Sequence, residues 1–451
     1  MKVAKFGGTS LSTSEQMKKV ADIVETNPDI KVVVASAPGK RFIEDIKITD
    51  YLIQLYAKVK NGDDYNFEFQ TIIKRFSDII NGLELSSTNL SEKLSQTLND
   101  YIHTIESPIY LLEALKSIGE DFSAQVFAAY LKSKGLNFEY MSPKDAGMLV
   151  TNQPGNAIVL NESYDLIGKL NEKDTRYVIP GFFGYSKNGE IVTFSRGGSD
   201  ISGAIIARGI QADAYENYTD QTHILTAHPE VVDNPQPIDQ ITYSEIRELS
   251  YAGFGIFHEE ALQPLLHSDI PIVIKNTNSP KETGTSIVSE RQDINTYPII
   301  GVSGRDGYMS ITIKEYFLNR KVGYLRHVLE IFEDYGISVE HVPTGIDYIS
   351  VVVRSDQFKS QARLDQLVEE LYENFTIESL TIEKNLTSIA VVGEGMHDIV
   401  GPINQATAAF ESAGIQPRMI IQGASEISMF FIVEEADENP GIHVLYDKFF
   451  S

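Results

Sequence analysis

The sequence predicts an α/β protein with a mostly parallel sheet between helices, followed by two small ferredoxin-like modules. Two observations support this fold class. Short β-branched runs alternate with amphipathic helical segments through the first part of the chain, which is typical of βαβ units with parallel strands. The last part contains an internal repeat, in which three glycines recur at an offset of 78 residues: Gly323, Gly336 and Gly345 match Gly401, Gly414 and Gly423.

The first elements predict a βαβ unit. We expect a strand at residues 2–6, an amphipathic helix at residues 13–26, and a strand buried on both faces at residues 30–35 (IKVVVA), because that run is almost continuously β-branched. A connection of this kind is right-handed. Residues 50–118 are largely helical and more polar than a crossover needs, so we expect a helical subdomain over one edge of the sheet.

Further apolar runs next to turns predict the remaining elements of the first domain. Residues 202–209 (SGAIIARG) are expected to form a short helix, and proline and asparagine in residues 276–281 predict a loop near the end of this domain. The additional strands are expected at residues 138–141, 157–160, 177–180, 191–193 and 270–275.

Each repeat of the last part has the pattern strand, helix, Gly-Ile turn, strand, hairpin and strand. Gly336 and Gly414 follow the two helices, where a left-handed residue that caps the helix would favour glycine. The periodicity therefore predicts two βαββ modules whose small sheets can pair edge to edge. An interface between them is a natural place for a small ligand.

Composition narrows the class of function. The chain has 451 residues, a formal net charge of −25 and no cysteine. Nucleic acid and anionic membranes need a clustered positive field, so neither is expected as a partner. Without cysteine there are no disulfides, thiolate metal sites or cysteine nucleophiles. No run approaches the roughly 20 apolar residues that span a bilayer, and the start lacks a signal-peptide core. We therefore expect a soluble, cytoplasmic protein.

Two glycine-rich turns, each between a strand and a helix, are the main candidates for chemistry. In Lys5–Ser10 (KFGGTS), glycines let backbone N–H groups approach phosphate oxygens, and Lys5 can neutralise a transferring phosphoryl group. The lysine precedes the glycines, so this is not a Walker A loop. Arg196–Asp200 (RGGSD) offers an arginine that can grip a carboxylate beside a nest of N–H groups. The alternatives are a plain strand–helix junction and a capped helix start.

Two shorter segments give weaker signals. Glu120 in Gly119–Ser123 could hold a substrate ammonium, although a surface acidic run is the commoner explanation. Thr219 and Asp220 could contact a nucleotide, with an Asx turn as the alternative. The histidines have no partners at ligand spacing, so no metal site is expected.

Together these segments resemble the aspartokinases. KFGGTS, Gly119-Glu120, Gly181–Gly184 and RGGSD occur in the family's order, with two ACT-type repeats behind them, and the resemblance covers essentially the whole chain. It implies an amino-acid-kinase fold over residues 1–295 and two βαββαβ ACT modules over residues 300–380 and 385–451. It also implies transfer of the ATP γ-phosphoryl to the side-chain carboxylate of L-aspartate, the first step of lysine, threonine and methionine biosynthesis.

The resemblance also implies roles for individual residues. Lys5 would be catalytic, with Asp200 orienting it. Magnesium would be carried on ATP oxygens, with no tightly bound cofactor. The residues that would bind aspartate are Thr49, Glu120, Phe182, Arg196 and Ser199. The residues that would bind ATP are Lys5, Gly7, Gly8, Thr9, Ser10, Thr219, Asp220 and Lys275.

The ACT-type pair implies feedback control by lysine or threonine and a homodimer formed through these modules. Effector binding is expected in two segments of the first module, namely Gly323, Tyr324 and Leu325, and Ser338, Val339 and Glu340. The alternative is that both repeats serve dimerisation alone.

The nucleotide side departs from the family pattern at two positions. Glu230 stands where the family has an arginine, and Gly255 where it has a lysine; Lys275 is a candidate for the compensating charge. These losses motivate one alternative, an amino-acid-sensing protein with a weakened kinase domain. A separate alternative is another carboxylate kinase of the same fold, acting on glutamate or an acylated amino acid.

Overall fold

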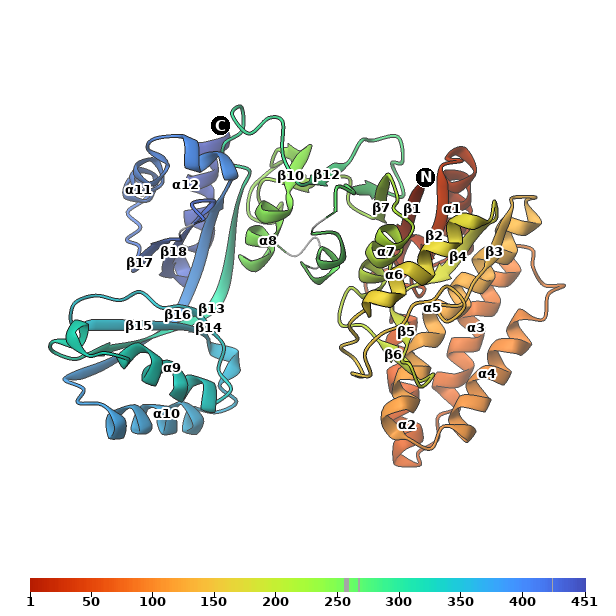
Figure 1. Cartoon of the computed structure of the whole chain (residues 1–451), viewed down its shortest axis with the longest axis horizontal. Helices are drawn as coiled ribbons and strands as arrows, with labels where there is room; N and C mark the ends of the chain where they lie inside the picture. Colours follow the sequence, from red (N-terminus) through yellow and green to blue (C-terminus); the bar gives the residue numbers. More distant parts are fainter. Residues whose placement is uncertain (255–258, 267, 424) are drawn as a thin grey trace. The chain divides into compact units, whose positions relative to one another are not determined.

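The computed structural model describes residues 1–254, 259–266, 268–423 and 425–451 (Figure 1). The chain forms two compact units. The N-terminal unit comprises Met1–Ile224, Pro237–Tyr243 and Ile256–Arg291, and the C-terminal unit comprises Leu225–Gln236, Ser244–Gly255 and Gln292–Ser451. None of the described helices is long and apolar enough to cross a membrane.

An eight-stranded sheet forms the centre of the N-terminal unit, in the order β10-β12-β11-β7-β1-β2-β4-β3. All of its neighbouring strands are parallel except β11 and β12. The predicted α/β fold with a mostly parallel sheet is confirmed. The strands are β1 (Lys2–Phe6), β2 (Ile30–Ala35), β3 (Phe138–Tyr140), β4 (Arg176–Pro180), β7 (Ala214–Thr219), β10 (Gln240–Thr242), β11 (Ile272–Asn276) and β12 (Thr285–Val288).

Helices cover both faces of this sheet (Figure 1). Side chains of a strand alternate between its faces. Ala4 and Phe6 therefore point into the apolar core shared with α1 (Ser14–Thr26) and α5 (Pro108–Ser133). Lys5 points to the opposite face, where it meets α7 (Gly198–Gly209). The strand pattern thus directs Lys5, which is itself buried, toward α7.

The helical subdomain expected after the second strand is present. α2 (Ile48–Asn61), α3 (Asn66–Gly82) and α4 (Leu90–Thr104) pack with α5 as a bundle beside the sheet (Figure 1). The other helices and short strands of the first part of the chain are α6 (Asn161–Gly168), α8 (Tyr243–Tyr251), β5 (Phe183–Tyr185), β6 (Ile191–Thr193), β8 (Ile224–Leu225) and β9 (Pro237–Ile238).

The strand expected at residues 157–160 is wrong. Within that segment only Val159 pairs, through an isolated bridge to Val150. The backbone N–H groups of Ala157 and Leu160 donate to the carbonyls of Thr193 and Leu149, and that of Ile158 donates to the Thr151 hydroxyl. The run therefore makes one isolated bridge to residues 149–151 and one bond to Thr193, instead of continuing as a strand.

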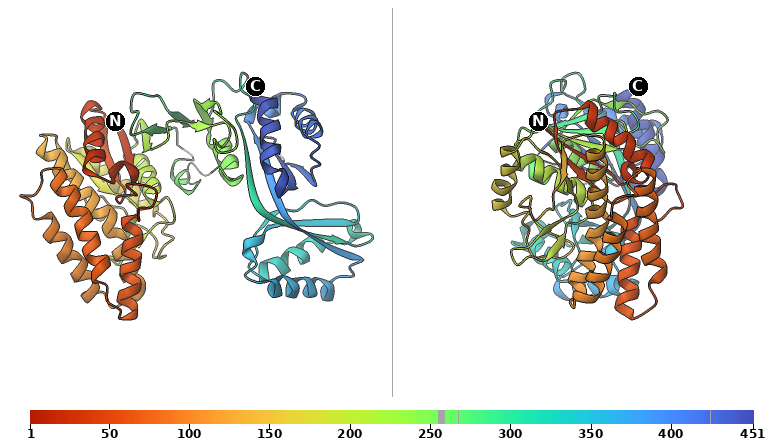
Figure 2. Two further views of the ribbon diagram at one scale, coloured as in Figure 1. Left: turned by 180° about the vertical axis from the view of Figure 1, so that it is seen from behind. Right: turned by 90° about the vertical axis from the view of Figure 1, so that its right-hand side faces the viewer.

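The C-terminal unit contains one six-stranded sheet, β14-β15-β13-β16-β18-β17, in which all neighbours are antiparallel. Two long strands run through both repeats (Figure 2). The strands are β13 (Gly301–Lys314), β14 (Val339–His341), β15 (Tyr348–Arg354), β16 (Ser379–Val392), β17 (Met419–Gln422) and β18 (Ser428–Glu434). The helices are α9 (Tyr324–Asp334), α10 (Gln361–Asn374), α11 (Pro402–Ser412) and α12 (Glu438–Phe450).

The two repeats share this sheet because β13 and β16 each serve both. Residues 301–305 of β13 pair with the second half of β16, and residues 310–314 pair with its first half. The register shifts between these halves, around Arg305 to Ser310. Gly336 and Gly414 have φ of +66° and +70°, so the prediction of left-handed glycines after the two helices is confirmed.

Candidate active site

A cavity of about 950 Å³ lies in the N-terminal unit at the carboxyl ends of β1, β2, β4 and β7. Ligands of open α/β sheets bind at this edge. Twelve of the fourteen residues expected to act on ATP or aspartate line it: Lys5, Gly7, Gly8, Thr9, Thr49, Glu120, Phe182, Arg196, Ser199, Asp200, Thr219 and Asp220.

Lys5 is buried and held at the wall of this cavity. Its Nζ lies 2.5 Å from Oδ1 of Asp200 and 3.4 Å from Oδ1 of Asn217. The side-chain amide of Asn217 donates to Asp200 Oδ1 over 2.7 Å, and the Tyr215 hydroxyl donates to the Asp200 carbonyl. The lysine charge is therefore fixed by a carboxylate on one helix and an amide on the neighbouring strand.

Asn217 is a site residue that the sequence analysis missed. It is Lys5's direct neighbour in the parallel pairing of β1 with β7. Only knowledge of that pairing could have brought together two residues so far apart in the chain.

The RGGSD turn starts α7 in the wall of the cavity. Gly197 precedes the helix with φ of +73°, a conformation that costs glycine little. Gly198 packs so closely that a Cβ would lie 2.6 Å from Cδ2 of Phe182. Phe182 itself has φ of +76°, which is unusual for a bulky residue. The double glycine thus lets the aromatic side chain and the start of the helix share one small space.

Glu120 is buried in α5 rather than exposed in a surface acidic run. Its Oε2 has no hydrogen-bond partner among the described residues. Burial raises the pKa of Glu120 to about 8, while a backbone hydrogen bond from Ala37 and the charge of Lys116 act in the opposite direction. A Cβ on Gly119 would lie 2.8 Å from that of Ala37, so the glycine allows α5 to approach the loop after β2.

Lys116 is a second residue that the sequence analysis missed. It lies one helical turn before Glu120 and lines the same cavity. Its Nζ is 2.6 Å from Glu113 Oε1 and 2.8 Å from Thr193 Oγ1, and lies 5.8 Å from the ring centre of Phe182. The spacing of Lys116 and Glu120 on a helix was a signal that could have found it.

Lys40 and Lys47 are further cations of the cavity that the sequence analysis did not identify. Both lie in residues 36–47, the loop between β2 and α2, and their side chains are exposed. Arg196 is also exposed and, within the part of the chain that the structure describes, forms no ion pair.

Ser10 and Lys275 do not line the cavity. The Ser10 hydroxyl is hydrogen-bonded to that of Thr277 over 2.7 Å. Lys275 lies in β11, with Nζ 5.8 Å from the ring centre of Tyr218. Glu230 is exposed in the C-terminal unit, and its carboxylate lies 4.0 Å from His228 Nδ1. Gly255 lies outside the described residues.

The residues expected to bind an effector lie in the C-terminal unit. Gly323, with φ of +78°, precedes α9, in which Tyr324 is buried and Leu325 is partly exposed. Ser338 is hydrogen-bonded through its backbone to the side chain of Gln357. Val339 and Glu340 lie in β14, and the Tyr251 hydroxyl donates to Glu340. No group of three or more metal-ligating side chains occurs among the described residues.

The sheet and its cavity define a kinase of amino-acid-kinase type. Residues 1–276 match the amino acid kinase family, and residues 389–449 match an ACT domain. The chain is 43% identical over 452 residues to aspartokinase 3 of Bacillus subtilis, covering 100% of this chain and 99% of that one. The chain therefore belongs to the aspartokinases, enzymes with aspartate kinase activity that use ATP.

Two further relatives also align with this chain over nearly its full length. The chain is 25% identical over 461 residues to the lysine-sensitive aspartokinase 3 of Escherichia coli, covering 99% of each. The crystal structure of Clostridium acetobutylicum aspartate kinase superposes with a TM-score of 0.88 at 37% identity and covers 100% of both chains.

Proposed function

We propose that the cavity transfers the γ-phosphoryl group of Mg-ATP to the side-chain carboxylate of L-aspartate, giving 4-phospho-L-aspartate. One observation carries this proposal. A single cavity combines a fixed lysine beside a glycine turn with a buried carboxylate and an arginine that has no ion-pair partner among the described residues. The first pair suits a phosphoryl group, and the second suits the ammonium and carboxylate of an amino acid.

On the acceptor side, Glu120 would accept the aspartate ammonium and Arg196 would bind its α-carboxylate. The unpartnered Oε2 of Glu120 supports the first role, because a buried oxygen of this kind is stabilised by a donor that arrives with the substrate. Thr49, Phe182 and Ser199 would shape the rest of the pocket.

On the donor side, Lys5 would balance the charge of the transferring phosphoryl group. Gly7, Gly8 and Thr9 would offer backbone donors, with Thr219 and Asp220 on the nucleotide side. Ser10 would act indirectly through its bond to Thr277, and Lys275 from beyond the cavity wall. Magnesium would be carried mainly by ATP oxygens.

The acceptor is already an anion, so the reaction needs no general base. Positioning and electrostatic stabilisation then account for the rate. Asp200 would keep the Lys5 ammonium in place between the two substrates, since it forms the lysine's shortest contact.

The acceptor can be tested by incubating the protein with Mg-ATP and aspartate, glutamate or N-acetylglutamate, and trapping acyl phosphate with hydroxylamine. We expect product with aspartate alone. Product with glutamate or N-acetylglutamate instead would indicate another carboxylate kinase. No product with any acceptor would favour the amino-acid-sensing alternative. That alternative is motivated by Glu230, which stands where the family has an arginine.

We also propose that the C-terminal unit binds lysine or threonine as a feedback inhibitor through the two segments around Tyr324 and Glu340. The name of the lysine-sensitive relative supports lysine. In a titration of each amino acid against activity, we expect lysine to inhibit at saturating aspartate and ATP. Inhibition by threonine alone would identify threonine, instead of lysine, as the effector. No inhibition by either amino acid would contradict the regulatory role of the C-terminal unit.

The proposed domains are residues 1–295, 300–380 and 385–451, with a homodimer formed through the ACT modules. Because residues 301–305 pair with the second half of β16, the start of the proposed first module also contributes to the sheet of the second module.

A further inference from the structure

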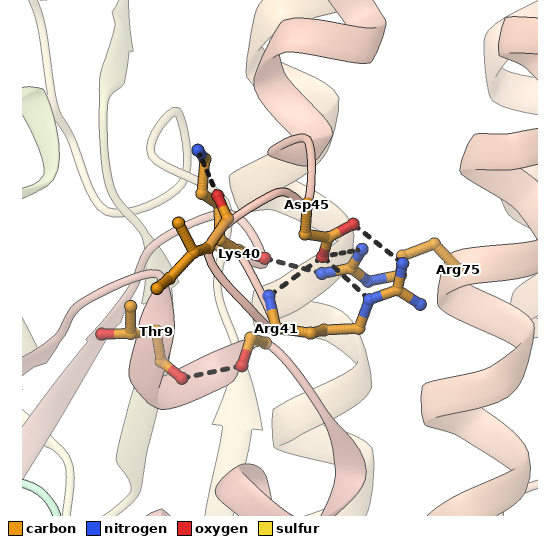
Figure 3. Close-up of polar contacts among 8 residues, drawn as sticks. Thr9, Lys40, Arg41, Asp45 and Arg75 are labelled. Carbon is orange, nitrogen blue, oxygen red and sulfur yellow. Dashed lines mark hydrogen bonds and ion pairs between the residues drawn. The ribbon is translucent and has the colours of Figure 1, made fainter.

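A cluster of three charged residues, of which Asp45 and Arg75 are buried and Arg41 is exposed, holds the loop at residues 36–47 (Figure 3). We call Arg41, Asp45 and Arg75 the clamp. Arg41 donates from Nε and one terminal nitrogen to the two Asp45 oxygens, over 2.8 and 2.9 Å, and from its backbone N–H over 2.9 Å. Arg75, on α3, donates to the same carboxylate over 2.9 Å. One carboxylate therefore ties the loop to a helix of the bundle.

The Asp45 carboxyl group of the clamp is ionised at neutral pH. Asp45 and Arg75 are 7% and 5% exposed. The hydrogen bonds from Arg41, together with the charge of Arg75, hold the pKa of Asp45 well below its usual range. Charged pairs in bidentate geometry fix both position and orientation, so this loop is held more rigidly than turn residues alone would hold it.

The clamp connects through Gly39 to the glycine turn that follows Lys5 in KFGGTS. The second terminal nitrogen of Arg75 donates to the Gly39 carbonyl over 2.6 Å, and the Gly39 N–H donates to the Gly8 carbonyl over 2.7 Å. The two backbones are so close that a Cβ on Gly39 would lie 2.6 Å from the Gly8 carbonyl carbon. A continuous path of contacts thus runs from α3 through the loop to the turn after Lys5.

The loop carries two lysines into the cavity. Lys40 directly follows Gly39, and Lys47 precedes α2; both are exposed and line the cavity. Lys40 Nζ donates to the Ile43 carbonyl over 3.0 Å. Neither lysine forms an ion pair within the described residues.

The other lysines of the cavity wall are already paired. Lys5 is bound to Asp200 and Lys116 to Glu113. A polyphosphate entering a protein with a net charge of −25 needs unpaired cations nearby. Lys40 and Lys47 supply them beside the glycine turn.

We propose that the loop at residues 36–47 is a second phosphate-binding element of this enzyme. Lys40 and Lys47 contact the ATP phosphates, and Asp45 with Arg75 is the positioning pair that presents them. This inference rests on the proposed function of the cavity. It also explains how the site binds a nucleotide without the family's arginine at the position of Glu230.

The lysine roles are tested with Lys40→Met and Lys47→Met, compared with Lys60→Met. Lys60 is an exposed lysine of α2 that does not line the cavity, so it is a matched control. We expect each cavity variant to raise the KM for ATP about tenfold while the KM for aspartate changes less than twofold. The control should match the wild type. An unchanged KM for ATP, or a rise confined to the KM for aspartate, would overturn the proposal.

A double-mutant cycle tests whether Asp45 acts through the lysine. Asp45→Asn should raise the KM for ATP about tenfold, and the double variant with Lys40→Met should be no worse than either single variant. Fold-changes that multiply would show that Asp45 does not position Lys40. If Asp45→Asn fails to fold, Arg75→Lys replaces it in the same cycle, since it keeps the charge and loses the bond to Gly39.

Calorimetric binding of Mg-ADP to the same variants separates this inference from the proposed reaction. Binding weakened about tenfold in both lysine variants, but not in the control, supports the loop whichever acceptor the enzyme uses. Equal binding by all variants would refute the loop even if aspartate is phosphorylated. A wild type that binds Mg-ADP but forms no aspartyl phosphate would contradict the acceptor assignment alone.

Discussion

Lys5→Met is expected to lower kcat about a thousandfold while the protein stays folded. Methionine fills a similar volume but removes the buried cation that Asp200 holds beside the glycine turn. Preorganised groups that stabilise transition-state charge are each worth about 10²–10³ in kcat. Here the loss is larger, because the carboxylate of Asp200, 2.5 Å from Nζ in the native protein, then repels the phosphoryl group. Steady-state kinetics, with thermal unfolding as the check on folding, measures the effect.

Two companion variants sharpen this test. Lys2→Met lies on the same strand, where the lysine pairs with Glu216 outside the cavity, and should keep kcat within twofold. The double variant Lys5→Met/Asp200→Asn should be at least as active as Lys5→Met, because it removes the unpaired carboxylate. A further loss in the double variant would give Asp200 a role beyond holding the lysine. Near-normal turnover by Lys5→Met would refute the phosphoryl role of Lys5.

The parts of the site that lie in short contiguous segments could be predicted from sequence. KFGGTS and RGGSD each combine glycines with a charged residue where a strand ends and a helix begins. In a parallel sheet such junctions meet at one edge, so the cavity follows from the strand order. Asp200, which is expected to orient Lys5, lies 2.5 Å from its Nζ.

The residues missed are those whose place depends on tertiary structure. Asn217 reaches Lys5 only through the pairing of β1 with β7, which sequence periodicity does not fix. In the sequence, Lys40 and Lys47 look like ordinary surface lysines. Their place at the cavity depends on the loop that carries them, and that loop is held by Arg75, which lies on another helix.

In the C-terminal unit, too, some features could be predicted from the sequence and others could not. The offset of 78 residues identified two related modules and the left-handed glycines after their helices. It did not reveal that β13 and β16 continue through both modules. A repeat in sequence specifies which units resemble each other, whereas strand length and register decide whether they share a sheet.

Glu120 is expected to make aspartate binding strongly dependent on pH. Burial raises its pKa from the usual 4.5 to about 8, so the empty site is largely protonated at pH 6–7. A protonated carboxyl group cannot pair with an ammonium, and binding must therefore release the proton. The KM for aspartate should fall about tenfold per pH unit between pH 6 and 8 and level off above pH 8. Initial rates at saturating ATP measure this profile.

Glu120→Gln should abolish that dependence and leave a KM for aspartate about a hundredfold above the wild-type value at pH 8.5. Lys116→Met should raise the pH at which the KM for aspartate levels off, because the lysine charge favours the ionised form of Glu120. Stability gives an independent readout. Since the folded-state pKa is raised, the contribution of Glu120 is fully present below pH 4.5 and is lost as the pH rises through about 8. The glutamine variant should therefore unfold at a higher temperature than the wild type at pH 9 without substrate. A flat aspartate profile in the wild type, with an unchanged KM in Glu120→Gln, would remove Glu120 from the ammonium site.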